Sequence, residues 1–265
     1  MKKKKGVLNC VYLGVVLVYL YAPIAVLILM GFNASRYNSL PFTFSLEWYQ
    51  ALADNPELIT ALKNSLLLAL VTAVVCMVIG TMFVLSLSAF PGKVSGLFNS
   101  VAMMPMSIPW IIIALSILLF IRFLGFGKNL FFVLMGHVVI ALPYMLLVLR
   151  ARIQSIDPSL EEMSSSLGAG PLVTFRRITL PSLASAIIAG AFLSFMISFD
   201  NFAISYFLMP TGTSILPVVI QTSIKYGFTP EINAISTIVI GMSLACLAVV
   251  ACIMKSSIKS MFGRK

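Results

Sequence analysis

The sequence predicts an all-α integral membrane protein with six transmembrane helices. Of its 265 residues, 60% are hydrophobic and only 10% are charged, whereas about a quarter of the residues in a soluble domain carry charge. Several apolar runs reach about 20 residues, the length at which a helix crosses a hydrocarbon core of about 30 Å. These observations exclude a soluble globular protein and favour a multi-span helical bundle.

Six apolar segments account for the predicted spans. They cover residues 7–32, 64–90, 97–121, 129–149, 183–209 and 233–254. The first segment follows Lys2–Lys5, as in a signal peptide, but about 26 residues exceed the apolar core of about 7–15 residues that a signal peptide has. We therefore expect a retained signal-anchor helix.

The positive charge is distributed unevenly over the loops. Six spans place both termini on one side, and with Lys2–Lys5 inside, 13 of the 18 Lys and Arg residues fall in inner segments. Basic residues gather in the cytoplasmic loops of membrane proteins. The net charge of +10 therefore reflects topology within membrane lipid, and we expect both termini in the cytoplasm and no nucleic-acid binding.

The outer loop at residues 33–63 carries Trp48 and Tyr49. Such aromatic side chains can anchor a protein at the membrane–water interface. They can also form part of a docking face for an external partner, and the sequence leaves both interpretations open.

Prolines interrupt several spans and are expected to kink them, because proline lacks the backbone donor that a helix interior needs. They stand at positions 23, 105, 109 and 143. Pro105 and Pro109 are one helical turn apart in the third span. This spacing favours a break that lines a pathway, although the irregularity of an ordinary bundle is the alternative.

The most informative segment is a polar loop at residues 157–181, between the fourth and fifth spans. Asp157 is suited to cap a helix whose first residue is Pro158. Gly168 is suited to end that helix in a left-handed conformation. Three apolar residues recur at the spacing of one helix face, namely Leu160, Met163 and Leu167.

A second short helix is predicted to start at Gly170 and Pro171 and to end near Arg176 and Arg177, with Pro181 beginning the next span. Two short helices with an apolar stripe can fit a groove on a partner. They can equally lie on the membrane surface. The local pattern leaves these two interpretations open.

The spacing Glu162-x5-Gly168-x9-Ile178-x-Leu180-Pro181 resembles the EAA loop of type I ABC importer permeases, the MetI-like family. The family's two alanines are Met163 and Ser164 here. The resemblance implies a MetI-like bundle with cytoplasmic coupling helices that a separate ATPase contacts. The coupling residues it implies are Glu161, Glu162, Met163, Leu167, Gly168, Phe175, Ile178, Leu180 and Pro181.

The resemblance extends over about residues 60–255 and is greatest to the spermidine/putrescine permeases. It rests on Phe199-Asp-Asn, Ile215-Leu-Pro and the segment from Phe228 to Ile238. It implies a cytoplasmic ATPase, a second permease subunit, an extracytoplasmic solute-binding protein and a place in the cytoplasmic membrane of a bacterium. The expected divisions are an N-terminal helix with outer loop at 1–60, a permease core at 61–255 and a basic cytoplasmic tail at 256–265.

Asp200 is the only acid inside a predicted span, and such an acid marks either a substrate path or an ion pair between helices. With Phe199 and Asn201 beside it, Asp200 could bind an ammonium group by charge, hydrogen bonds and cation–π contact. Relatives often carry acids where this chain has Asn201 and Trp110. Trp110 could still offer a cation–π face, which completes the predicted pathway.

No catalytic, cofactor or metal site is predicted. The sequence lacks G-x4-G-K-[ST], since Gly127-Lys128-Asn129 has neither the earlier glycine nor the hydroxyl residue. Ser164–Ser166 have no His or Lys base nearby. The four cysteines lie in apolar stretches as free thiols, and His137 is interpreted as an interhelical hydrogen-bond partner over a metal ligand.

The leading hypothesis is therefore a permease subunit of an ATP-driven importer, with a polyamine as cargo. The first alternative keeps this class and changes the cargo to ferric ion, thiamine or another cation. A channel or secondary carrier acting alone is the second alternative. A membrane enzyme is the third, and the missing nucleophile–base or metal constellation argues against it.

Overall fold

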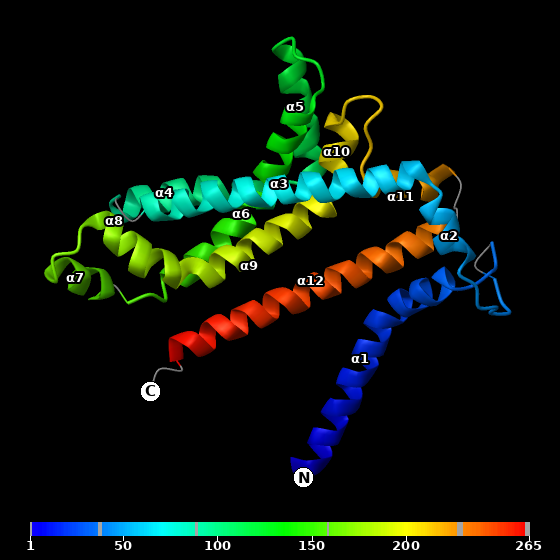
Figure 1. Ribbon diagram of the computed structural model, residues 1–265, viewed down its shortest axis with the longest axis horizontal. Helices are drawn as coiled ribbons and strands as arrows, with labels where there is room; N and C mark the ends of the chain where they lie inside the picture. Colours follow the sequence, from blue (N-terminus) through cyan, green and yellow to red (C-terminus); the bar gives the residue numbers. More distant parts are fainter. Residues whose placement is uncertain (1, 37–38, 88–89, 158, 227–229, 263–265) are drawn as a thin grey trace. The chain divides into compact units, whose positions relative to one another are not determined.

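The structure, a computed structural model, describes residues 2–262 apart from 37–38, 88–89, 158 and 227–229 (Figure 1). Within these residues every assigned element is a helix, besides an isolated bridge between Asn33 and Phe44. The helices are α1 (Lys2–Gly31), α2 (Glu47–Ala53), α3 (Pro56–Leu87), α4 (Gly92–Met103), η1 (Met104–Ser107), α5 (Trp110–Phe123), α6 (Leu130–Ile153), α7 (Ser159–Ser166), α8 (Pro171–Thr174), η2 (Phe175–Thr179), α9 (Leu180–Phe199), α10 (Phe202–Leu208), α11 (Leu216–Tyr226) and α12 (Glu231–Phe262).

Five helical segments in the described part of the chain are long and apolar enough to cross a membrane. They are Asn9–Gly31, Pro56–Leu87, Leu130–Ile153, Pro171–Phe199 and Glu231–Cys252. A sixth span results if Gly92–Ser107 and Trp110–Phe123 together make one crossing. The prediction of a six-span helical membrane protein is confirmed in this form.

The third predicted span is broken where its prolines stand. Pro105 lies in the short 3-10 helix η1, and Ile108 is extended ahead of Pro109. A residue before proline is pushed out of the helical conformation. The two helical pieces meet at an angle of 104°, so the break predicted from Pro105 and Pro109 is present.

The fifth predicted span, 183–209, had wrong limits. Helical structure runs without a gap from Pro171 to Phe199, and a separate helix, α10, follows after Asp200 and Asn201. Asn201 has an extended backbone, which ends the α9 helix before the apolar sequence ends. A continuous apolar run in the sequence therefore concealed a break between two helices.

The chain forms two compact units, Met1–Ile59 with Ile220–Cys246 and Thr60–Val219 with Leu247–Lys265. In the larger unit, α6 and α9 lie side by side (Figure 1). Met145 of α6 is fully buried and fits against two glycines, because a Cβ atom at Gly80 or Gly190 would overlap its side chain. Small residues allow helices in a membrane to approach closely.

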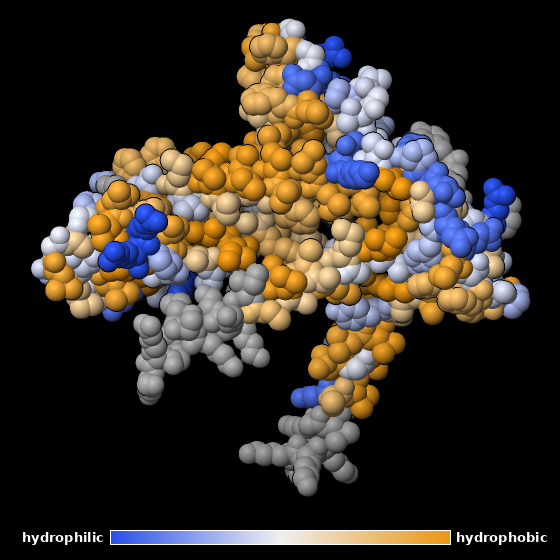
Figure 2. All heavy atoms as spheres, in the orientation of Figure 1, coloured by the Kyte–Doolittle hydropathy of each residue, from blue (hydrophilic) through white to orange (hydrophobic). Residues whose placement is uncertain are grey.

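The outward side chains of the larger unit are largely apolar. Along α3, Leu67, Leu70 and Val74 are exposed, and hydrophobic residues dominate the surface over this helix (Figure 2). Such an apolar surface is suited to contact with the hydrocarbon core of a membrane. A soluble protein could not leave an apolar surface of this extent exposed to water.

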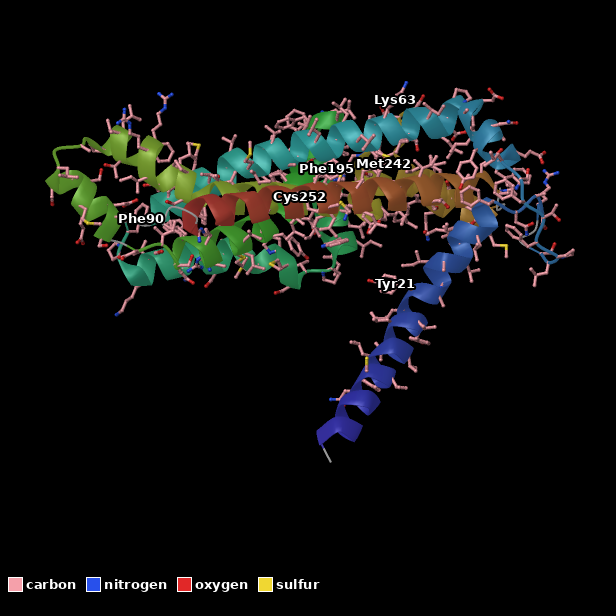
Figure 3. All side chains as sticks on the ribbon, turned by 60° about the horizontal axis from the view of Figure 1, so that its bottom comes forward. Tyr21, Lys63, Phe90, Phe195, Met242 and Cys252 are labelled. Carbon is pink, nitrogen blue, oxygen red and sulfur yellow. The ribbon has the colours of Figure 1, made fainter. Side chains whose placement is uncertain are left out.

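The smaller unit contains α1 and the loop that follows it. Apolar and aromatic side chains, Tyr21 among them, project from α1 (Figure 3). In the loop, Asn33 is fully buried, and its side chain accepts from Thr43 N at 3.0 Å and donates to Ser39 O at 2.9 Å. The Trp48 indole donates to the Asn33 carbonyl at 2.8 Å, so its polar group serves the fold of the loop itself.

Candidate coupling loop and translocation pathway

Helix α7 begins as the sequence predicted. The Asp157 carboxylate accepts a hydrogen bond from the Ser159 backbone N–H at 3.0 Å. This hydrogen bond lowers the pKa of Asp157 below its ordinary value, because the bond favours the charged form of the carboxyl group. Pro158, predicted as the first helical residue, lies outside the described residues.

The C-terminus of α7 also follows the prediction. Gly168 has a φ angle of +82°, a conformation that costs residues with a Cβ atom free energy. Its N–H bonds to the Ser165 carbonyl at 3.0 Å, and Ala169 N–H bonds to the Ser164 carbonyl at 3.1 Å. This is the paired pattern of a Schellman cap, and it turns the chain back toward α8.

Two hydroxyl contacts join α7 to the following helix. Ser164 Oγ lies 2.8 Å from Thr174 Oγ1, and both side chains are buried. Thr179 Oγ1 donates to Glu161 Oε1 at 2.6 Å. The serine that replaces an alanine of the EAA pattern thus has a matching hydroxyl opposite it, so α7 and the helix after it form one packed hairpin.

The predicted second short helix is wrong in its C-terminal limit. The N–H of Leu180 bonds to the Phe175 carbonyl five residues back, in a π-helical turn at Phe175–Thr179. This turn connects α8 directly to α9, so Arg176 and Arg177 lie inside a longer helix and not at a helix end. Pro181 likewise lies in the first turn of α9, after helical structure has already begun.

The apolar stripe of α7 is uncovered. Leu160, Met163 and Leu167 are 38%, 54% and 88% exposed, and Leu172 of α8 is 77% exposed. Burial of such a face in a partner groove would be favourable. The other residues predicted for coupling divide by burial: Glu161, Glu162, Gly168, Leu180 and Pro181 are exposed, and Phe175 and Ile178 are half-buried.

Asp200 lies at the C-terminal end of α9. Its backbone N–H bonds to the Met196 carbonyl at 3.1 Å, and it occupies the C-terminal cap of α9. The residue is exposed. The sequence placed this acid inside a continuous span, whereas the structure places it at a break between α9 and α10.

Asn201 begins the next helix. Its Oδ1 accepts a hydrogen bond from Ile204 N–H at 2.8 Å, which makes it the N-terminal cap of α10. The side chain is fully buried, and its Nδ2 has no hydrogen-bond partner within the described chain. The amide oxygen is therefore committed to the cap in this conformation.

Of the two predicted aromatic residues, Phe199 directly precedes this break, and Trp110 lies on α5, the helix packed on α10. Phe199 is buried and stacks on Phe195, with ring centroids 5.8 Å apart. Trp110 is the first residue of α5 and packs against the apolar cluster that contains Ile204 and Leu208 of α10. The structure thus brings all four predicted pathway residues to the α9–α10 break or to the helix packed on it.

His137 supplies the polar contacts that the sequence could not specify. The residue is fully buried in α6. Its Nδ1 lies 2.8 Å from Ser198 Oγ, and its Nε2 lies 2.9 Å from Ser205 Oγ. The interpretation as an interhelical hydrogen-bond partner is confirmed, and in the described residues three or more His, Cys, Asp or Glu side chains nowhere gather as a metal site.

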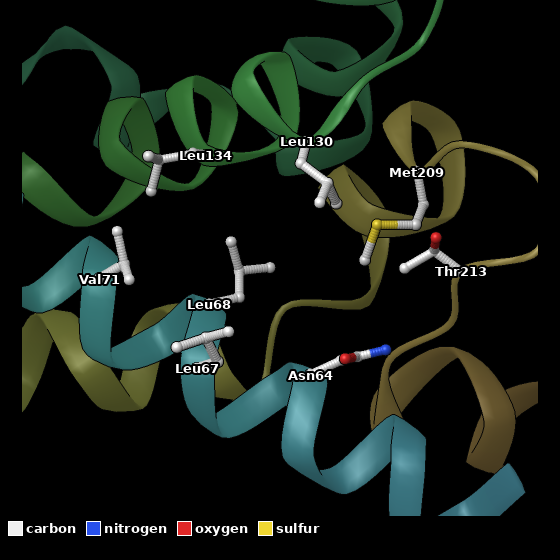
Figure 4. A pocket seen from close by; sticks show the side chains of 8 residues that line it. All are labelled: Asn64, Leu67, Leu68, Val71, Leu130, Leu134, Met209 and Thr213. Atoms are coloured by element: carbon white, nitrogen blue, oxygen red, sulfur yellow. The ribbon is translucent and has the colours of Figure 1, made fainter.

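A cavity of about 190 Å³ opens beside α3 (Figure 4). Its lining residues are Asn64, Leu67, Leu68, Val71, Leu130, Leu134, Met209 and Thr213. None of these side chains carries a charge, so the cavity offers no ionic partner to a cation. Asn64 also donates to the Ser214 carbonyl at 2.9 Å, which holds the loop after α10 against α3.

Residues 77–262 match the family described as "Binding-protein-dependent transport system inner membrane component". This match covers more than half of the chain. The chain belongs to this family. Membership in this transport family confirms the importer permease that the loop spacing predicted, and it makes the chain a multi-pass protein of the inner membrane.

Relatives of this transport-family chain include two permeases with named cargoes. The spermidine/putrescine transport system permease protein PotC of Haemophilus influenzae is 32% identical over 234 residues, which are 88% of this chain and 91% of the relative. The putrescine transport system permease protein PotI of Escherichia coli is 32% identical over 232 residues, which are 84% and 82% of the two chains. The predicted likeness to spermidine/putrescine permeases is confirmed.

Solved transporter structures share the fold of this family member. A chain of a bacterial ABC transporter involved in the import of the acidic polysaccharide alginate matches with a TM-score of 0.70 and 17% identity, over 97% of this chain and 96% of that chain. A chain of the MetNI methionine ABC transporter matches with a TM-score of 0.62 and 19% identity, over 76% and 96%. At these identities the likeness establishes the permease fold alone.

Proposed function

We propose that this chain is the transmembrane permease subunit of an ATP-driven importer that carries spermidine or putrescine across the cytoplasmic membrane. The observation that carries the proposal is the 32% identity to a spermidine/putrescine permease over 88% of this chain and 91% of the relative. The putrescine permease PotI supports the same cargo class at 32% identity.

The proposed transporter contains several subunits with different roles. A cytoplasmic ATPase docks on residues 157–181, a second permease completes the pore, and an extracytoplasmic solute-binding protein delivers the cargo. The chain has no ATPase site of its own, since its sequence lacks G-x4-G-K-[ST]. The uncovered apolar face of α7 supports the docking step, because closure of an ATPase around it would bury that face.

Topology follows from the charge distribution. Both termini are cytoplasmic, and 1–60 forms the N-terminal helix with an outer loop, 61–255 the permease core and 256–265 a basic tail. With residues 157–181 inside, α9 crosses the membrane toward the outer side. The excess of Lys and Arg in the inner segments supports this orientation.

The geometry of α9 supports a mechanical link between ATP hydrolysis and cargo. The 29 residues from Pro171 to Phe199 make a helix of roughly 43 Å at about 1.5 Å per residue. In its N-terminal part, Thr179 is hydrogen-bonded to Glu161 of α7, and its C-terminal end leads directly into Asp200. If α9 moves as a rigid body with α7, movement of α7 by the ATPase would shift the Asp200 carboxylate at the other end of α9.

Asp200 is the proposed cargo contact. Its exposed carboxylate can accept charge-assisted hydrogen bonds from an ammonium group, and Trp110 offers a ring face for a cation–π contact. Phe199 and Asn201 hold the backbone on either side of the acid. In this assignment Asn201 contributes through its cap on α10, because its oxygen is already bound to Ile204 N–H.

Reconstitution tests the proposal. The chain is purified with its ATPase and sister permease, placed in liposomes and supplied with the loaded binding protein, and uptake of labelled spermidine and putrescine is measured with and without ATP. ATP-dependent polyamine uptake is expected. Uptake of thiamine or ferric ion in preference to polyamine would change the cargo, and transport by the chain alone without ATP would indicate a secondary carrier or channel.

A further inference from the structure

A chain of buried polar side chains crosses the apolar core of the larger unit. It contains Thr72 of α3, His137 of α6, Ser198 of α9 and Ser205 of α10, and each of these residues is at most 1% exposed. His137 stands at its centre, within 2.9 Å of both serine hydroxyls. Ser198 Oγ donates to Thr72 Oγ1 at 3.2 Å, and Thr72 Oγ1 donates to the Leu68 carbonyl at 2.8 Å.

The hydrogen bonds among these four residues allow one consistent set of donors and acceptors. Thr72 gives its hydrogen to a carbonyl, so it accepts from Ser198, and Ser198 must then accept from the Nδ1–H of His137. A neutral imidazole with Nδ1–H has an acceptor at Nε2, which Ser205 O–H satisfies. The side-chain polar atoms of Thr72, His137, Ser198 and Ser205 therefore all have partners when His137 is neutral and protonated at Nδ1.

The two serines lie on opposite sides of the break that carries Asp200. Ser198 is two residues before Asp200, and Ser205 is four residues after Asn201. His137 thus holds the last turn of α9 and the first turns of α10 at a fixed separation. Apolar neighbours such as Ile140 and Ile204, both buried, offer these polar groups no alternative partners, so a change in the break would leave buried groups unpaired.

We propose that His137 is a positioning residue that sets the geometry of the Asp200–Asn201 break and, through it, the preference among cationic cargoes. The inference rests on the proposed function, since it assumes that the Asp200 carboxylate contacts the cargo. The cargoes separated would be cations that differ in the spacing of their ammonium groups. If the Asp200 carboxylate moves by about an ångström, its distance to the second ammonium group changes. One spacing between the ammonium groups then fits better than another.

Two variants remove the bonds at different points. His137→Leu removes both contacts of the ring, and Ser205→Ala removes the bond on the α10 side alone. Ser205→Thr keeps the hydroxyl and serves as the conservative variant. Ser194→Ala is the matched control, because Ser194 is on α9, is fully buried and donates to the Ala141 carbonyl at 3.5 Å, away from the break.

The first measurement uses the complete importer in liposomes at saturating loaded binding protein. Uptake of spermidine and of putrescine is compared with ATP hydrolysis in the same samples. We expect His137→Leu and Ser205→Ala to change the ratio of the two uptake rates roughly threefold to tenfold, the size expected for one interhelical hydrogen bond. Hydrolysis per assembled complex should stay within about twofold, and Ser205→Thr and Ser194→Ala should match the unmodified protein.

A structural role alone would give a different result. Loss of both uptake rates in proportion to hydrolysis, with an unchanged cargo ratio, would overturn the proposal. Hydrogen–deuterium exchange separates this result from a failure of the proposed function, because it needs no cargo. We expect faster exchange at residues 201–206 in His137→Leu and in Ser205→Ala, but not in Ser194→Ala. Unchanged exchange there would also overturn the proposal, whereas absence of polyamine uptake in the unmodified importer would overturn only the cargo assignment.

Discussion

The hydroxyl of Thr179 donates a hydrogen bond to Glu161 Oε1 over a distance of 2.6 Å. Thr179 is the last residue of the π-helical turn that leads into α9, and Glu161 lies in the first turn of α7. The contact therefore ties the helix proposed to meet the ATPase to the helix that ends at Asp200. It gives the proposed coupling a specific bond that mutation can remove.

Substitution of Thr179 by valine should weaken this coupling. Valine preserves the shape of the side chain and removes the donor, and a hydrogen bond to a charged group contributes about 1.5–3 kcal/mol, which exposure of Glu161 reduces. We expect the number of cargo molecules moved per ATP to fall about twofold to fivefold. The measurement is uptake and hydrolysis in the same liposomes.

Ser165→Ala is the control for this experiment, because Ser165 is exposed and its hydroxyl donates to the Glu161 carbonyl within its own helix. It should keep the normal ratio of transport to hydrolysis. An unchanged ratio in Thr179→Val would show that the contact does not transmit movement.

Replacement of Gly168 by aspartate should impair docking of the ATPase. A residue with a Cβ atom at a φ of +82° costs about 1 kcal/mol or more, and the added charge would stand beside the apolar residue Leu167. We expect less ATPase to copurify with the variant. Gly170→Ala, where φ is −70° and no atom would meet the new methyl group, should leave copurification unchanged, and equal loss in both variants would contradict the conformational explanation.

Alanine at Gly190 should destabilise the larger unit. The new methyl group would overlap the Met145 sulfur, and overpacking of this kind costs about 1–3 kcal/mol. The midpoint of thermal unfolding in detergent should fall. Combined with Met145→Ala, Gly190→Ala should lower the midpoint less than the two single substitutions do together, because the smaller side chain leaves room for the methyl group. Gly241→Ala, which meets no atom within 4 Å, should have little effect. A midpoint unaffected by Gly190→Ala would mean that α6 and α9 are less tightly packed than described.

Much of the loop was predictable because its signals are local. Asp157 and Gly168 act on backbone groups within a few residues, so cap chemistry alone located both ends of α7. Pro105 and Pro109 predicted the break in the third span for the same reason. Where a single residue decides the local backbone, the sequence sufficed.

Other features depend on contacts between distant residues. The helix continues into Pro181 because a π-helical turn precedes it, and the proline signal alone had suggested a helix start. The end of α9 at Asp200 is concealed in an unbroken apolar run. The partners of His137 are 61 and 68 residues away, and only the packing of α6 on α9 and α10 identifies them.

Asp200, at the far end of the helix joined to the coupling loop, is proposed to contact a cationic cargo. Transport by the complete importer with Asp200→Asn tests this contact most directly, with Asp200→Glu as the variant that keeps the charge. Loss of a charge-assisted contact should reduce polyamine uptake about tenfold in Asp200→Asn, with ATP hydrolysis retained and partial uptake in Asp200→Glu. Uptake at the unmodified rate in Asp200→Asn would show that this carboxylate does not contact the cargo.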